Sequence, residues 1–225
     1  MQLSDQTLTI LKNFAAINQG IVIKPGNVLR TVSLTHSLMA EATVPDYFDR
    51  KIVLYDLSKM LAIIQSSPDI EIEDNQLVLI GMGGKAKTYI RFSFEGAIVQ
   101  PPASQPKVDD YELKFELLKN QFQWIMQTAS ILKCPTIIFS GDKETGEVKV
   151  SPQDHKGVDV DSGSLSIGST NLNEDIKVVI KLEDMKMIPG TYEVSVSKEG
   201  LAKFEMKEVG ANTSITYWSA GEVNV

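Results

Sequence analysis

Residues 81–85 contain the residue types of a phosphate-binding loop, three glycines and a lysine in the order Gly-Met-Gly-Gly-Lys. A P-loop needs four residues between its first glycine and a Gly-Lys-Ser/Thr run, and a helix must follow. Here Ala86 follows the lysine, and a strand pattern comes next. The stretch therefore predicts a hairpin turn and no nucleotide chemistry.

Metal-binding and nucleophilic residue types are few. Residues 159–163 begin like a calcium loop, but their glycine comes one position early and no glutamate closes the loop. His36 and His155 are the only histidines, neither lies in a zinc or catalytic-triad pattern, and we expect both to be solvated. Cys134 is interpreted as a small core residue. We predict no metal, no cofactor and no catalysis, although a hydrolase using an unrecognised carboxylate pair stays open.

Composition narrows the class of protein further. The chain has 225 residues, 43% of them hydrophobic, and 22 basic residues against 29 acidic ones give a net charge of -7. That balance argues against a generally basic nucleic-acid binder, but it permits a local basic patch. The single cysteine favours a reducing intracellular compartment. We expect no signal peptide and no membrane-spanning segment.

Two stretches in corresponding places of the two halves, residues 4–19 and 116–132, predict amphipathic helices. Ser4 is a suitable N-cap for the first of them. The expected apolar sides are Ile10, Leu11, Phe14, Ala15 and Ile17 in the first helix, and Leu118, Phe122, Ile125, Ala129 and Leu132 in the second. The expected polar sides are Asp5, Thr9, Lys12, Asn13, Ala16 and Gln19, and Glu116, Lys119, Asn120, Gln123, Gln127 and Ser130.

The remaining pattern is mainly of short strands, with shorter helices expected at 56–67 and 182–187. The order of strand, short helix, strand, tight turn and two strands recurs, so the chain reads as four related βαβββ units, two in each half. Proline-rich residues 95–110 indicate an extended connector. We therefore predict an α+β fold with antiparallel sheets in two similar domains, residues 1–108 and 109–225.

Three runs carry a resemblance to a known family: LKNFAAINQGIVIKPGN, KIVLYDLSKML and MKMIPGTYEVSVSKEGLAKFE. They resemble the sliding clamps of T-even-type bacteriophages, most strongly over residues 8–64 and 185–205. The resemblance implies the DNA-clamp fold, with helices lining a closed homotrimeric ring and sheets outside. It also implies a DNA polymerase processivity factor that hydrolyses nothing and works in the cytoplasm of an infected bacterium. The implied partners are double-stranded DNA, the replicative polymerase, a clamp loader ATPase and late transcription factors.

A sliding ring must hold duplex DNA without reading its bases, so diffuse phosphate contacts suit it better than contacts to base edges. Clamps of this family usually carry more basic residues on the long second-half helix than this chain does. Here Gln127 and Ser130 occupy the polar face of that helix. The expected DNA-facing residues are Lys12, Asn13, Lys59, Lys119, Gln123, Gln127, Lys133 and Lys186.

Subunits of such a ring would pair through sheet edges, because unpaired edges are an aggregation hazard. We expect these edges near residues 88–94 and 158–167, with Tyr89, Phe92 and Leu165 at the subunit interface.

Partner peptides would dock on an exposed apolar patch. Ile98 and Val99 are adjacent apolar residues in the proline-rich connector, and Trp218 could supply an aromatic anchor. Two other interpretations stay open: the connector pair pins the connector to the sheet, and Trp218 belongs to the core. For the whole chain, a trimeric, β-rich virion structural or assembly protein is the alternative function.

Overall fold

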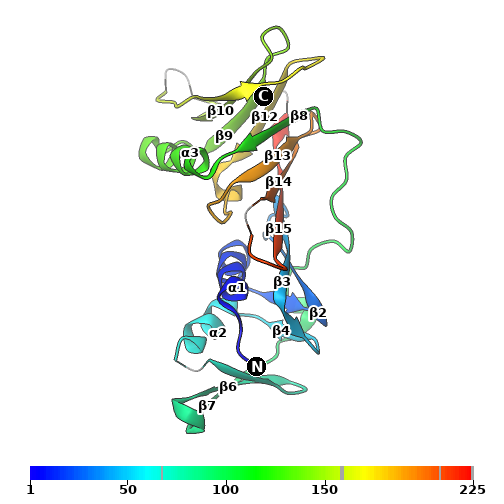
Figure 1. Cartoon of the computed structure of the whole chain (residues 1–225), viewed down its shortest axis with the longest axis vertical. Coiled ribbons are helices and arrows are strands. Elements are labelled where there is room, and N and C mark those ends of the chain that lie inside the picture. The colour runs from blue at the N-terminus through cyan, green and yellow to red at the C-terminus, as the bar shows by residue number, and fades with distance from the viewer. Residues whose placement is uncertain (67, 158–159, 208, 224–225) are drawn as a thin grey trace. The chain divides into compact units, whose positions relative to one another are not determined.

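The computed structural model describes residues 1–66, 68–157, 160–207 and 209–223 (Figure 1). The chain forms two compact units. Unit 1 contains Met1–Ala103 with Val209–Ile215, and unit 2 contains Ser104–Glu208 with Thr216–Val225. Ser67 and residues 158–159, at the ends of a predicted helix and a predicted strand, lie outside the described residues.

Unit 1 contains two helices that pack together, α1 (Asp5–Ile17) and α2 (Leu57–Ile64). Each begins at a side-chain cap: Ser4 Oγ accepts from Thr7 N at 3.2 Å, and Asp56 Oδ1 accepts from Lys59 N at 2.9 Å. The residues predicted for the apolar side of α1 are buried, apart from the half-buried Ala15, and α2 buries Leu57, Met60, Leu61 and Ile64. The 3.6-residue period therefore identified both helices correctly.

The strands of unit 1 are all antiparallel. A two-stranded sheet pairs β1 (Ile21–Ile23) with β4 (Ile52–Leu54), and β2 (Gly26–Val32) pairs with β3 (Leu38–Phe48). A three-stranded sheet has the order β5-β6-β7, with bounds Asp69–Ile72, Gln76–Gly81 and Ala86–Arg91. The glycine-rich stretch is a one-turn 3-10 helix, Met82–Gly84, between β6 and β7, which confirms the predicted hairpin turn.

Unit 2 contains α3 (Lys119–Leu132) and two groups of antiparallel strands. One is a five-stranded sheet in the order β11-β10-β9-β12-β16, with bounds Leu165–Ser169, Glu147–Gln153, Thr136–Gly141, Ile176–Lys181 and Glu222–Val223. The other contains β15, β14, β13 and β8, with bounds Ser214–Ala220, Leu201–Met206, Tyr192–Val196 and Leu113–Leu117.

Aromatic side chains hold α3 against the sheets of unit 2. The ring centroids of Phe122 on α3 and Tyr192 on β13 are 5.7 Å apart, and Phe139 on β9 meets Phe204 on β14 edge-on at 5.8 Å. Such aromatic pairs add to the free energy gained by burial. The core thus fixes which face of α3 points outward.

Several predicted boundaries and faces in this half were wrong. The helix expected from residue 116 begins at Lys119, because residues 116 and 117 continue strand β8. Leu118, expected on the apolar side, is the N-cap and is exposed. The strand expected at 158–167 is β11, which begins only at Leu165. The short helix expected at 182–187 is reduced to one 3-10 turn, η3 (Leu182–Asp184).

Candidate nucleic-acid interface and partner surfaces

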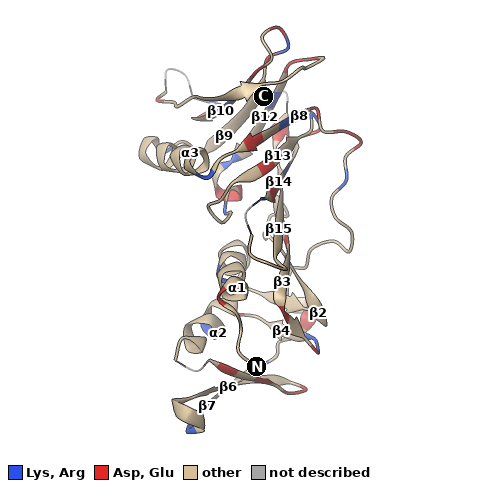
Figure 2. Ribbon diagram, viewed as in Figure 1, with Lys and Arg blue, Asp and Glu red and all other residues tan. Residues whose placement is uncertain are grey.

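The outward face of α1 has the polar, weakly charged character that its sequence predicts. Asp5, Thr9, Lys12 and Ala16 are exposed there, and Asn13 is half-buried. On α2, Lys59 is exposed beside Ser58 and Ala62. Figure 2 shows α1 with little charge along it. Unit 1 therefore brings two of the predicted DNA-facing lysines, Lys12 and Lys59, to the solvent faces of two packed helices.

Asp46 on β3 fixes the start of α1. Its Oδ2 accepts from Ser4 N at 2.9 Å and from Ser4 Oγ at 2.7 Å. Burial alone would raise the pKa of Asp46, but hydrogen bonds from Thr7 and Ser4 hold it below its ordinary value. The ionised carboxylate thus anchors the cap of the helix that presents Lys12.

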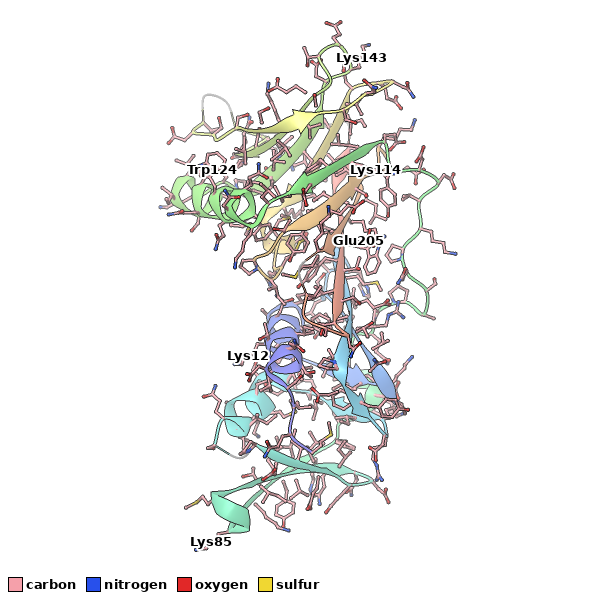
Figure 3. The ribbon with its side chains drawn as sticks, in the orientation of Figure 1. Lys12, Lys85, Lys114, Trp124, Lys143 and Glu205 are labelled. Carbon is pink, nitrogen blue, oxygen red and sulfur yellow. The ribbon has the colours of Figure 1, made fainter. Side chains whose placement is uncertain are left out.

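The outward face of α3 carries one cation, Lys119, together with the exposed Gln123 and Gln127 that we predicted. It also carries two large apolar side chains that the prediction missed, Trp124 at 39% exposure, labelled in Figure 3, and Ile131 at 69%. At 100° per residue, both fall on the same arc as Asn120 and Gln127. The helical period alone therefore places Trp124 on the outward face of α3.

Lys133 and Lys186 lie outside regular helix. Lys133 is the exposed C-cap of α3 in a left-handed conformation, with a φ of 54°. Lys186 follows η3, is exposed and lines a cavity of unit 2.

The predicted subunit edges coincide with outer strands. In the three-stranded sheet, the outer side of β5 is covered by the N-terminus, because Ile70 N donates to Met1 O at 2.7 Å. Strand β7 is the other edge, where Tyr89 is 58% exposed, and it has no further strand partner among the described residues. Strand β11, with the half-buried Leu165, is an edge of the five-stranded sheet. Phe92 was wrongly placed in the edge strand, because β7 ends at Arg91.

The first part of the connector is fastened to the rest of unit 1 by hydrogen bonds, by side-chain packing and by the ion pair between Lys51 and Glu95. Asn18 Nδ2 donates to Val99 O at 3.1 Å, and Arg30 Nη1 donates to Ala103 O at 3.0 Å. Ile98 packs so closely on Gly20 that a Cβ there would lie 2.8 Å from the Ile98 Cδ1. Ile98 is only 7% exposed, so its expected exposure was wrong, and the alternative that it pins the connector is confirmed.

Val99 is half-buried and borders a cleft with Val22, Val28, Lys24 and Arg30. Trp218 is only 3% exposed. The prediction that Trp218 is an exposed anchor was therefore wrong, and the alternative that it belongs to the core is confirmed.

The residues considered for catalysis or metal binding do not form such a site among the described residues. Cys134 is buried, and burial raises the pKa of its thiol, which disfavours the reactive thiolate. The described parts of the chain contain no group of three or more His, Cys, Asp and Glu side chains placed to hold a metal ion. Among the described helices, none is long and apolar enough to cross a membrane. His155 was wrongly expected to be solvated, since its side chain is 7% exposed.

Comparisons with known proteins agree with this geometry. Residues 4–75 match the family model described as DNA polymerase processivity factor. The chain is 24% identical over 207 residues to the sliding clamp of Vibrio phage KVP40, covering 91% of this chain and 94% of that one. It is 26% identical over 212 residues to the sliding clamp of Enterobacteria phage T4, covering 91% and 92%.

A comparison with solved structures also finds a similar fold. The structure of A. fulgidus PCNA with the C-terminal region of FEN-1 bound is similar, with a TM-score of 0.70 at 17% identity, covering 97% of this chain and 95% of that one. The chain therefore has the predicted DNA-clamp fold, and its resemblance to the sliding clamps of T-even-type phages is confirmed.

Proposed function

We propose that this chain is a sliding clamp that encircles duplex DNA as a ring and tethers a replicative DNA polymerase in viral DNA replication. The observation that carries the proposal is the extent of the similarity: each of the two phage clamps is matched over 91% of this chain and more than nine-tenths of its own length. The polar, weakly charged outward faces of α1 and α2 support it, because their few cations would hold DNA phosphates only weakly.

The ring would be a homotrimer closed by edge-to-edge strand pairing. Strand β7 of one subunit and β11 of the next are the proposed partners, with Tyr89 and Leu165 at the junction. The covered outer side of β5 supports this choice, because it leaves β7 as the available edge of its sheet. Pairing removes both open edges and closes the ring.

DNA contact would come from Lys12, Lys59, Lys119, Lys133 and Lys186 through phosphates, with Asn13, Gln123 and Gln127 acting through water. The sparse positive charge favours weak, transient contacts. Such contacts suit a tether that holds DNA by topology and not by affinity.

Partner peptides would dock in the cleft beside the connector. Val22, Val28 and Val99 give it an apolar wall, Lys24 adds positive charge, and the charge of Arg30 is paired with Glu41 at 2.8 Å. The A. fulgidus PCNA structure supports a short-peptide mode of binding, since it holds the C-terminal region of FEN-1. Replacing Val99 with Asp should abolish binding of the polymerase C-terminal peptide in calorimetry while the melting temperature stays unchanged. Retained binding with a lowered melting temperature would assign Val99 to the core instead.

The clamp itself would catalyse no reaction. An ATP-driven clamp loader would place it on DNA in the cytoplasm of the infected host, and late transcription factors would use the same ring. The hairpin turn at Met82–Gly84, where a phosphate loop would need a helix to follow, supports a separate ATPase.

Primer extension on a long circular template tests the function. With polymerase, loader and ATP, adding this chain should lengthen the products of single binding events. Unchanged product length across a range of clamp concentrations would contradict the proposal.

A further inference from the structure

The outward face of α3 differs from those of α1 and α2 because it exposes large apolar side chains. The exposed residues of α1 and α2 are polar, charged or alanine. On α3, Trp124, labelled in Figure 3, is 39% exposed, and Ile131, two turns further along the helix, is 69% exposed. Large apolar side chains that gather on one exposed face are typical of a contact surface.

The ring of Trp124 is held in place by the segment that leads into β11. A Cβ added at Gly163 would lie 3.2 Å from Trp124 Cη2 and 2.8 Å from Thr128 Cγ2, so the backbone passes close to the tip of the ring. Gly163 N donates to Pro152 O at 2.9 Å, which ties this segment to β10. Because the ring is already ordered, little side-chain entropy is lost when another molecule covers it.

The same helix is free of acidic side chains. Residues 119–133 contain two lysines and no aspartate or glutamate, although the whole chain has 29 acidic residues (Figure 2). Of the acidic residues in the neighbouring segments, Glu116 forms an ion pair with Lys207 at 3.0 Å, and Asp161 is exposed before Gly163. In a chain with a net charge of -7, this local absence of negative charge favours DNA as the occupant of the face.

Apolar and cationic residues share the outward arc of α3. At 100° per residue, Ile131, Asn120 and Gln127 lie within about 60° of Trp124, and Lys119 lies about 140° from it on the same side. The backbone of DNA has the same mixture, because each anionic phosphate is followed by a deoxyribose whose C–H groups are apolar. The bases of a duplex are stacked on one another, so the sugars supply the apolar surface of its backbone.

We propose that Trp124 and Ile131 contact the deoxyribose groups of the encircled duplex, next to phosphates that Lys119 contacts. This inference rests on the proposed clamp function and names the chemistry of one of its DNA contacts. Apolar contacts to sugars take the place of the cations that α3 lacks. They keep their strength as the salt concentration rises, whereas contacts to phosphate weaken.

Tryptophan fluorescence reports on this contact directly, because the only other tryptophan, Trp218, is 3% exposed. The protein is loaded on nicked circular DNA with a phage clamp loader and ATP, and the complex is isolated by gel filtration. Acrylamide quenching then measures the access of solvent to Trp124, and the Trp124→Phe variant supplies the background from Trp218. The quenching constant of Trp124 should fall on the circle, stay low as salt rises, and recover when one restriction cut releases the protein.

Matched variants test the chemistry of the contact through the rate of sliding, measured by tracking labelled protein on stretched DNA. Trp124→Ala should speed sliding by up to about fivefold at every salt concentration, the factor expected for covering about half of the exposed ring. Lys119→Ala should speed sliding at low salt, with an effect that vanishes at high salt. Leu34→Ala is the control: it removes a side chain that is 70% exposed in the turn between β2 and β3 of unit 1, and it should change nothing. Because each variant replaces an exposed side chain, its melting temperature should stay close to that of the wild type.

Co-elution with the circle measures encirclement, so it separates this proposal from the proposed function. Co-elution with an unchanged quenching constant, or sliding of Trp124→Ala at the wild-type rate, would overturn the sugar contact and leave the clamp function standing. Protein that fails to co-elute would overturn both. Protection of Trp124 by the polymerase without DNA would assign this face to a protein partner instead.

Discussion

Asn18 offers a sharp test of how the connector is held, because one buried amide satisfies three backbone groups. Its Nδ2 donates to Val32 O at 3.0 Å and to Val99 O at 3.1 Å, and its Oδ1 accepts from Gly20 N at 3.0 Å. Replacing Asn18 with Ala leaves all three groups without this partner. At about 1 kcal/mol for each hydrogen bond, the variant should lose about 3 kcal/mol of stability.

Urea unfolding at a fixed protein concentration measures this loss, because subunit association would otherwise shift the midpoint. The midpoint should fall with an unchanged m-value, and the melting temperature should fall by about 10 °C. Gln19→Ala is the matched control: the neighbouring side chain is exposed, and its change should stay within about 0.5 kcal/mol. A loss below about 1 kcal/mol for Asn18→Ala would refute the reasoning that this amide fastens the connector.

Three further predictions concern DNA contact, pH and assembly. Changing Lys12, Lys59 and Lys119 together to Ala should reduce polymerase stimulation while assembly survives. The slope of log binding constant against log salt concentration should fall by about one unit for each lost phosphate contact. Normal stimulation at all salt concentrations would show that these lysines do not face the DNA. Because hydrogen bonds hold the pKa of Asp46 below its ordinary value despite burial, its contribution to stability is complete above the ordinary carboxyl range and is lost as the pH falls through the folded-state pKa. The difference in unfolding free energy between wild type and Asp46→Asn should therefore be present at about pH 7 and shrink in acid below about pH 4, and a difference independent of pH would contradict this. If the proposed homotrimer closes through β7 and β11, Tyr89→Asp with Leu165→Asp should yield monomers in sedimentation without unfolding either unit. An intact trimer in this variant would move the interface elsewhere.

Local periodicity was sufficient for the elements whose burial follows one repeat. The buried face of α1 has the predicted residues, since the repeat of 3.6 residues decides which side chains of a helix face the core. The first residue of α3 could not be predicted from the local sequence. Residues 116 and 117 continue the pairing of β8 with β13, and that pairing depends on a strand about 75 residues away in the chain.

The residues predicted for partner binding depend on long-range packing more than the helices do. Ile98 and Trp218 are apolar in polar surroundings, which is also how an exposed patch looks in sequence. What buries Ile98 is Gly20, whose missing side chain makes room for it. The environment of His155, in the turn after β10, likewise depends on Thr136 on β9 and Glu222 on β16. No local pattern contains these contacts.

The central claim is that the protein holds DNA by encircling it. The most direct measurement is co-elution of the labelled protein with a nicked circular plasmid in gel filtration, after loading with a phage clamp loader and ATP. The protein should stay with the circle at high salt and leave it when one restriction cut makes the DNA linear. Equal retention on circular and linear DNA, or loss from both as salt rises, would contradict a topological link.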